Sequence, residues 1–252
     1  MRLYVLLIAH MLADFTLQTN KMAQRKKKEL KILLLHSAVY TVLMAIACFF
    51  SMDVESACGM VIWFGATHLC IDYVRIEQSN DNRDSLKELK LFVGDQVLHI
   101  GAILFACWLL QNQWESGCLV EIAEKSGLVR FLQNILWEGC TLHQLLRYIL
   151  LLVTIMDPAS IWVKQISYVT SNKMIDETEH GINHAGSLIG KLERLIIALL
   201  VMNEAYGSIG FVLTAKSLAR YKKLEEQEFA ESYLVGTLSS TAIAMVLAQL
   251  LG

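Results

Sequence analysis

The sequence contains little proline and none of the short motifs that mark common classes of soluble enzyme. Pro158 is the one proline in 252 residues, so proline is expected to interrupt a helix at a single place. No Walker A, GxGxxG, GxSxG or HExxH motif occurs, and the segment GSLIGK at 186–191 is too short for a phosphate-binding loop. The motifs therefore give no sign of a nucleotide-binding site, a serine hydrolase or a zinc protease.

Paired cysteines and a strong charge imbalance are also missing. The six cysteines show no CxxC spacing, which argues against a zinc ribbon or a thioredoxin-like redox site. Cysteines within apolar runs are expected to pack as small hydrophobic residues. The formal net charge is −2, so no nucleic-acid partner is expected.

Apolar residues, in contrast, are abundant. They make up 55% of the chain, against about 45–50% in a typical soluble domain. Several runs approach the roughly 20 residues that cross a bilayer as a helix, and they lack the alternation of barrel strands. We predict an all-α, polytopic integral-membrane helical bundle of about 6–8 transmembrane or re-entrant helices. The expected spans are 2–19, 31–50, 57–75, 91–110, 143–163 and 232–251.

The organisation predicted along the chain is one membrane domain, 1–252. It comprises a four-helix region at 1–110, an extracytoplasmic amphipathic connection at 111–142, and C-terminal helices at 143–252. The apolar stretch 190–219 is interrupted by NEAYG, which leaves open one long helix or two helices meeting in a turn.

Basic residues predict the orientation. The connection NKMAQRKKKELK at 20–31 holds six Lys or Arg and one Glu, which places it in the cytoplasm and the N-terminus outside. Because a basic run also follows 190–219, a hairpin or re-entrant pair fits this orientation better than a single crossing. The first apolar run lacks a cleavage site and is expected to be an uncleaved span.

Histidine and aspartate recur four residues apart in the first apolar segments. They occur in AHMLADF, ATHLCID and GDQVLHI, and LLLHSAVY adds one more histidine. Residues four apart share one helix face, and each ionisable group within a span costs about 2.5–3.5 kcal/mol. Counted at about 1.5 Å per residue, these groups lie roughly 5–15 Å from the predicted cytoplasmic surface. We therefore predict one shared site.

Imidazole and carboxylate ligands suit a divalent metal ion, zinc foremost and manganese or iron next. A catalytic ion keeps one position open for a water molecule, which it activates. The predicted metal ligands are His10, Asp14, His36, His68, Asp72, Asp95 and His99, with Asp14 and Asp95 as catalytic carboxylates. Predicted substrate or anion ligands are Arg194, Lys216 and Arg220, and further polar residues of interest are Gln18, Gln96, Asp157, Glu193 and Glu231.

Three functional hypotheses follow. The first is a metal-dependent hydrolase at the cytoplasmic leaflet, acting on a phosphoester or lipid-like substrate. The second is a proton- or metal-ion-coupled transporter or channel that uses the same residues, with Pro158 breaking a helix beside Asp157. The third is a non-catalytic membrane scaffold in which polar pairs set helix contacts. The lipid bilayer is the one partner expected, and homo-oligomerisation is left open.

The ordered motifs AHMLADFTLQ, LLLHSAVY, THLCIDYVR and FVGDQVLHI resemble a bacterial membrane-protein family described as domain of unknown function 3307. The resemblance continues in IGKLERLI, GFVLTAKSLARY and FAESYLVGTLSS. It implies a multi-pass protein of the bacterial inner membrane and little about biochemistry. More remotely, the His/Asp pattern is similar to membrane-bound metal-dependent hydrolases.

Overall fold

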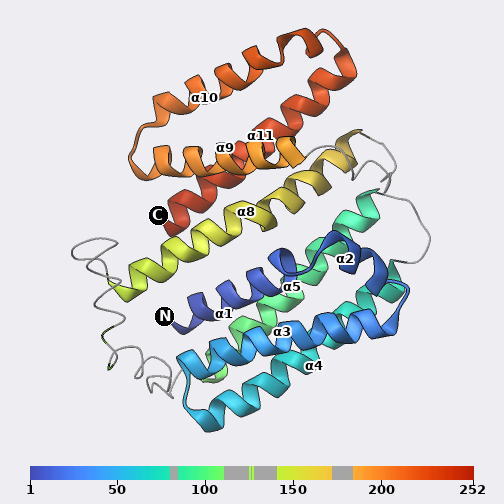
Figure 1. The fold of residues 1–252 in the computed structure, drawn as a ribbon, viewed down its shortest axis with the longest axis vertical. Helices are drawn as coiled ribbons and strands as arrows, with labels where there is room; N and C mark the ends of the chain where they lie inside the picture. The colour runs from blue at the N-terminus through green and yellow to red at the C-terminus, as the bar shows by residue number, and fades with distance from the viewer. Residues whose placement is uncertain (80–84, 111–124, 126, 128–140, 172–183) are drawn as a thin grey trace. The chain divides into compact units, whose positions relative to one another are not determined.

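The computed structural model describes residues 1–79, 85–110, 125, 127, 141–171 and 184–252. Every regular element in these ranges is a helix (Figure 1). Most of the predicted amphipathic connection 111–142 lies outside the described residues. The chain divides into two compact units, one of Met1–Asn80 with Leu91–Leu150 and the other of Asp81–Lys90 with Leu151–Gly252.

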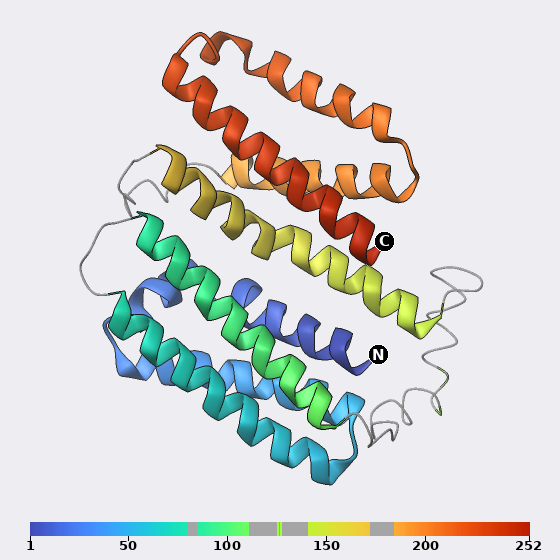
Figure 2. The ribbon, with the colours of Figure 1, turned by 180° about the vertical axis from the view of Figure 1, so that it is seen from behind.

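The first unit contains most of the N-terminal helices together with residues 142–150, and the second contains the rest of the C-terminal helices together with residues 85–90. The N-terminal elements are α1 (Arg2–Met11), a π-helical turn (Leu12–Thr16), α2 (Asn20–Lys26), α3 (Leu30–Ser51), α4 (Val54–Gln78) and α5 (Ser85–Leu109). The C-terminal elements are α8 (Leu142–Ser171), α9 (His184–Met202), α10 (Tyr206–Ala219), a 3₁₀ turn (Tyr221–Lys223) and α11 (Gln227–Leu251). In the first unit α3 packs against both α1 and α4, as Figures 1 and 2 show from opposite sides.

Among the described residues, five helices are long and apolar enough to cross a membrane: α3, α4, α5, most of α8, and α11. Their outward side chains are largely apolar, with Val42, Ile62 and Leu98 all more than half exposed. This is the surface expected of helices that face lipid tails. The all-helical prediction is confirmed for the described residues, while the count of 6–8 remains a prediction.

The first apolar segment is shorter than expected. The predicted span 2–19 ends as a helix at Thr16, after ten α-helical and five π-helical residues. At about 1.5 Å per residue, these fifteen residues reach roughly 22 Å, less than the hydrocarbon core. The next helix begins at once, because the Thr19 side chain caps α2 by accepting a hydrogen bond from the Met22 N–H at 3.2 Å.

The turns between long helices follow ordinary capping chemistry. Asp53 begins α4, where its carboxylate accepts a 2.9 Å hydrogen bond from the Ser56 N–H. That bond favours the charged carboxylate and lowers the pKa of Asp53. At the same end of the unit, buried Arg2 donates to the Ser51 carbonyl at 3.2 Å and to the Leu110 carbonyl at 2.9 Å. Arg2 thus satisfies carbonyls where α3 and α5 end.

The apolar core of the first unit occupies one part of the bundle. Leu6, Met44, Phe64 and Ile103, from four different helices, are each at most 1% exposed. The N-terminal turns of α3 and α5 and the C-terminal turns of α4 lie beyond this core along their helices. The polar residues described below come from those turns.

The segment 190–219 forms two helices that meet in a turn, which resolves the alternative left open by the sequence. α9 ends at Met202 and α10 begins at Tyr206. Between them Glu204 has a φ of 57°, in the left-handed region. A left-handed residue lets the chain reverse within three residues, and glycine adopts this conformation with less strain than glutamate.

The conformation of Glu204 predicts that Glu204→Gly stabilises the hairpin by about 1 kcal/mol, since a side chain at positive φ costs about that much. Glu204→Ala keeps a Cβ atom at the same φ and should give no such gain. Unfolding of the purified protein in mixed detergent micelles measures both variants. Equal stability of the glycine and alanine variants would contradict the prediction.

Candidate metal centre

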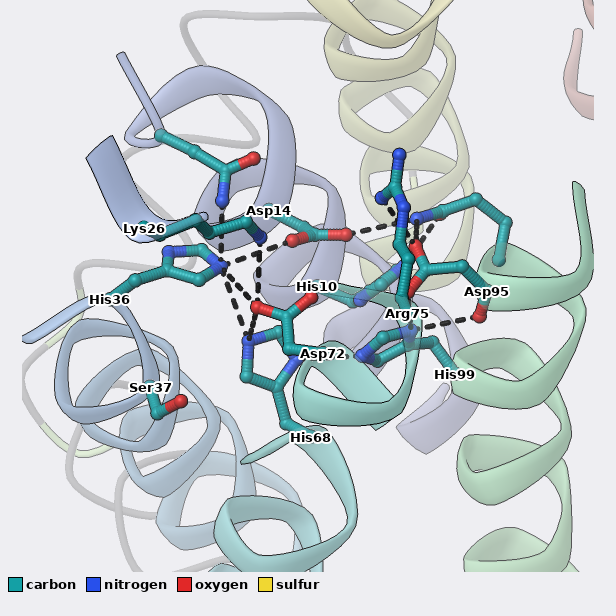
Figure 3. A network of polar contacts seen from close by, with 12 residues as sticks. His10, Asp14, Lys26, His36, Ser37, His68, Asp72, Arg75, Asp95 and His99 are labelled. Carbon is teal, nitrogen blue, oxygen red and sulfur yellow. Dashed lines mark hydrogen bonds and ion pairs between the residues drawn. The ribbon is translucent and has the colours of Figure 1, made fainter. Parts of the chain in front are cut away.

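The structure brings together all seven residues that the sequence singled out as ligands (Figure 3). None of them is more than 7% exposed. They are His10 from α1, Asp14 from the π-helical turn, His36 from α3, His68 and Asp72 from α4, and Asp95 and His99 from α5. The four-residue spacing aligned each His–Asp pair on one face, and the packing of four segments turns these faces inward.

The histidines form a connected series with an assignable hydrogen-bond direction. His99 Nδ1 lies 2.8 Å from the Asp95 main-chain carbonyl, so this nitrogen carries a hydrogen and donates it. In a neutral imidazole, His99 Nε2 is then an acceptor, and it lies 2.7 Å from His68 Nδ1. His68 Nδ1 therefore donates, which leaves His68 Nε2 with a lone pair.

His36 Nε2 faces several electron-pair donors at once. It lies 3.2 Å from His68 Nε2, 3.3 Å from Asp14 Oδ1 and 3.5 Å from Asp72 Oδ2. The Gln18 amide nitrogen, which carries hydrogens, lies 3.0 Å from the same atom. His36 Nε2 has one lone pair, so a metal ion bound there would replace the Gln18 contact, and His68 Nε2, Asp14 Oδ1 and Asp72 Oδ2 bring further lone pairs to the same place.

The spacing of these atoms fits a metal ion. Zinc–ligand bonds near 2.0–2.1 Å place tetrahedral ligand atoms about 3.3 Å apart. Asp14, His36 and His68 offer ligand atoms that all lie within 4.8 Å of one another, and so do Asp14, Asp95 and His99. Asp14 belongs to both groups. The first group has the better donors, because the 2.7 Å contact of His99 with His68 is already a hydrogen bond.

Gln96 organises the carboxylates on the α5 side. Its amide nitrogen donates to Asp14 Oδ2 at 2.9 Å and to Asp95 Oδ2 at 3.0 Å, while its oxygen lies 3.3 Å from His10 Nε2. Asp95 Oδ1 and His10 Nδ1 are buried and have no hydrogen-bond partner among the described residues. The site therefore retains unused acceptor capacity beside its ligand atoms.

Two cations and an aromatic ring complete the site. Lys26 Nζ donates to Asp72 Oδ2 at 2.8 Å, and Arg75 donates to Asp95 Oδ2 at 3.0 Å. The Tyr40 ring stacks on His68, with centroids 3.7 Å apart and planes 4° apart.

None of these three residues was predicted from the sequence to belong to the site. Tyr40 had a usable signal, since it lies one turn after His36. Nothing in the sequence distinguished Lys26 from the other basic residues of the connection 20–31.

Other predicted residues lie in the second unit and make contacts there. Arg194 donates to the Ile155 carbonyl at 2.6 Å and the Met156 carbonyl at 3.0 Å, near Pro158. Lys216 pairs with Glu193 at 2.6 Å.

Three more predicted residues are also in the second unit. Asp157 pairs with Lys191, Arg220 is exposed at the end of α10, and exposed Glu231 accepts a 2.9 Å hydrogen bond from Gln227. The anion-binding role of Arg194, Lys216 and Arg220 remains a prediction.

Removing Arg75 is predicted to destabilise the protein by about 3 kcal/mol, because Asp95 would keep a buried charge without its cation. Arg75→Met tests this in chemical unfolding. The double variant Arg75→Met/Asp95→Asn also removes the charge and should recover part of the loss. Equal losses in the single and double variants would show that packing, not charge, is responsible.

Comparison with known proteins gives one match. The family described as "Protein of unknown function (DUF3307)" matches residues 3–129, a range that contains all seven His and Asp residues of the site. None of the curated proteins and none of the solved structures matches the chain. The match covers half of the chain, and the protein belongs to the DUF3307 family.

Proposed function

We propose that this protein is an integral-membrane, metal-dependent hydrolase whose metal ion is held by the His/Asp site of the first unit. One observation carries the proposal: lone-pair-bearing atoms of His68, Asp14 and Asp72 converge within 3.2–3.5 Å of His36 Nε2 in a buried site. A shared cation would bind these lone pairs and stabilise their convergence. Zinc suits the mixture of imidazole and carboxylate ligands best, followed by manganese or iron.

The ligand set favours hydrolysis over a purely structural metal site. Asp14, His36 and His68 supply three ligands, and three protein ligands with an open position are typical of catalytic zinc. A metal in such a site supplies Lewis acidity and an activated water molecule. Asp95 is placed to accept a proton, because its Oδ1 is without a hydrogen-bond partner among the described residues.

The proposed substrate is a phosphoester or lipid-like molecule reached from the cytoplasmic leaflet of the bacterial inner membrane. Arg75, whose side chain is 25% exposed, is the most accessible cation that contacts the site, and a guanidinium binds phosphate well. The basic helix α2 and the positive-inside rule support a cytoplasmic position for this end of the bundle and an outside N-terminus.

The second candidate is a proton or metal-ion pathway. It is favoured by the unbroken contacts from His36 through His68 to His99, at 3.2 and 2.7 Å. Imidazoles in contact pass protons along a chain, and such chains occur in membrane pumps and transporters.

Metal analysis tests the hydrolase proposal. Purified wild-type protein should contain about one equivalent of transition metal, and His68→Ala/His99→Ala should lose it, because a ligand and its orienting partner are both gone. His143→Ala is the matched control, since His143 packs edge-on against Tyr4 outside the site. Absence of metal from the wild type, or retention by the double variant, contradicts the proposal.

Activity separates the two candidates. The hydrolase predicts metal-dependent release of p-nitrophenol from p-nitrophenyl phosphate or its bis ester, abolished in Asp14→Asn. The pathway predicts pH-dependent ion flux in proteoliposomes that also requires Asp14. Flux without any hydrolysis by metal-loaded protein would replace the first candidate with the second.

A further inference from the structure

Lys26 has an unusual position for a lysine in a basic connection. It is the last residue of the short helix α2, and its neighbours Arg25, Lys27 and Lys28 are exposed. Lys26 itself is only 7% exposed. Burying an ammonium group costs free energy unless it is paired, and Lys26 pairs with Asp72 at 2.8 Å inside the site (Figure 3).

The oxygen that Lys26 holds is the one that faces the candidate metal ligands. Asp72 Oδ2 lies 3.5 Å from His36 Nε2 and 3.6 Å from His68 Nε2. These distances are close to the roughly 3.3 Å expected between ligands of one tetrahedral ion. By position, Asp72 Oδ2 is placed to serve as a fourth ligand beside His36, His68 and Asp14.

Charge explains why the ammonium matters. Asp72 and Asp95 are each paired with one cation, Lys26 and Arg75, whereas the partners found for Asp14 are His36 and Gln96. With neutral imidazoles, one negative charge remains for a divalent ion to neutralise. An Asp72 carboxylate engaged by an ammonium is a weaker metal ligand than a free one.

We propose that Lys26 keeps Asp72 off the metal ion, and so maintains a three-ligand site with an open fourth position. The inference rests on the proposed metal site and adds a positioning residue to it. Without the ammonium, Asp72 would close the fourth position. A closed four-ligand zinc site is typical of structural zinc and leaves no place for water or substrate.

Metal affinity gives the first test. Lys26→Met should bind zinc at least about tenfold more tightly than wild type in competition with a chelating dye, an effect of the size seen for groups that act on metal ligands. Lys26→Met/Asp72→Asn removes the fourth carboxylate as well and should return the affinity to near the wild-type value. Lys27→Met, from the adjacent exposed position, should change nothing.

An anion probe tests the open position directly. In the cobalt-substituted wild type, azide should enter the open position and change the visible absorption spectrum, and in Lys26→Met it should not. Equal or weaker zinc binding by Lys26→Met, or azide binding equal to that of the wild type, overturns the inference. Lys26→Gln, which retains a hydrogen-bond donor without the charge, repeats both measurements if the methionine variant does not fold.

These results are distinguishable from failure of the proposed hydrolase. Zinc and azide binding that follow the expected pattern, without hydrolysis of either nitrophenyl ester, would contradict the hydrolase and leave the role of Lys26 standing. Hydrolysis that persists in a Lys26→Met variant with unchanged zinc affinity would do the reverse. A wild type that binds no metal overturns both.

Discussion

The convergence on His36 Nε2 is the interaction on which the first unit depends. At this one atom α3 makes polar contacts with the π-helical turn at Asp14 and with α4 at His68 and Asp72, at 3.2 to 3.5 Å. Apolar packing of the bundle is non-directional and would tolerate small rotations of each helix. The polar contacts would not, because a rotation that moved one imidazole would leave several buried groups unpaired. The polar site therefore fixes the rotation of each helix, and the apolar core fills the space that remains.

The π-helical turn explains how α1 contributes to both sides of the site. His10 is in regular α-helix and reaches Gln96 on α5, while Asp14, one turn on, reaches His36 on α3. A π-helical turn accommodates an extra residue and changes the direction of the side chains that follow it. Such turns occur frequently at functional sites. Here the turn makes Asp14 common to both groups of candidate ligands.

Much of the site was predictable, because its signal is local and physically costly. A histidine and an aspartate four residues apart in an apolar helix need polar partners, because burying them unpaired costs free energy. Three such pairs at similar depth can be each other's partners, which predicts that they lie together. Lys26 was not predictable, since a lysine between two helices is ordinarily a solvated charge that sets orientation. The early end of the first helix at Thr16 was also missed, because the apolar residue Leu17 continues the hydrophobic run beyond the last helical residue. The pair of helices that meets at 203–205 was favoured by the basic run after 190–219, but the positive φ of Glu204 was not foreseen, since glutamate is uncommon in that conformation.

The guanidinium of Arg2 connects helix ends of the first unit by a second kind of polar contact. Arg2 donates hydrogen bonds to the main-chain carbonyl oxygens of Ser51 and Leu110, which are present whatever the side chains at these positions. The contacts of the histidine site are made between side chains, which a substitution can remove. The Arg2 contacts lie at the C-terminal ends of α3 and α5, whereas the histidine site lies toward the other ends of these helices. A substitution in the histidine site therefore leaves the main-chain contacts of Arg2 at the C-terminal ends of α3 and α5 in place.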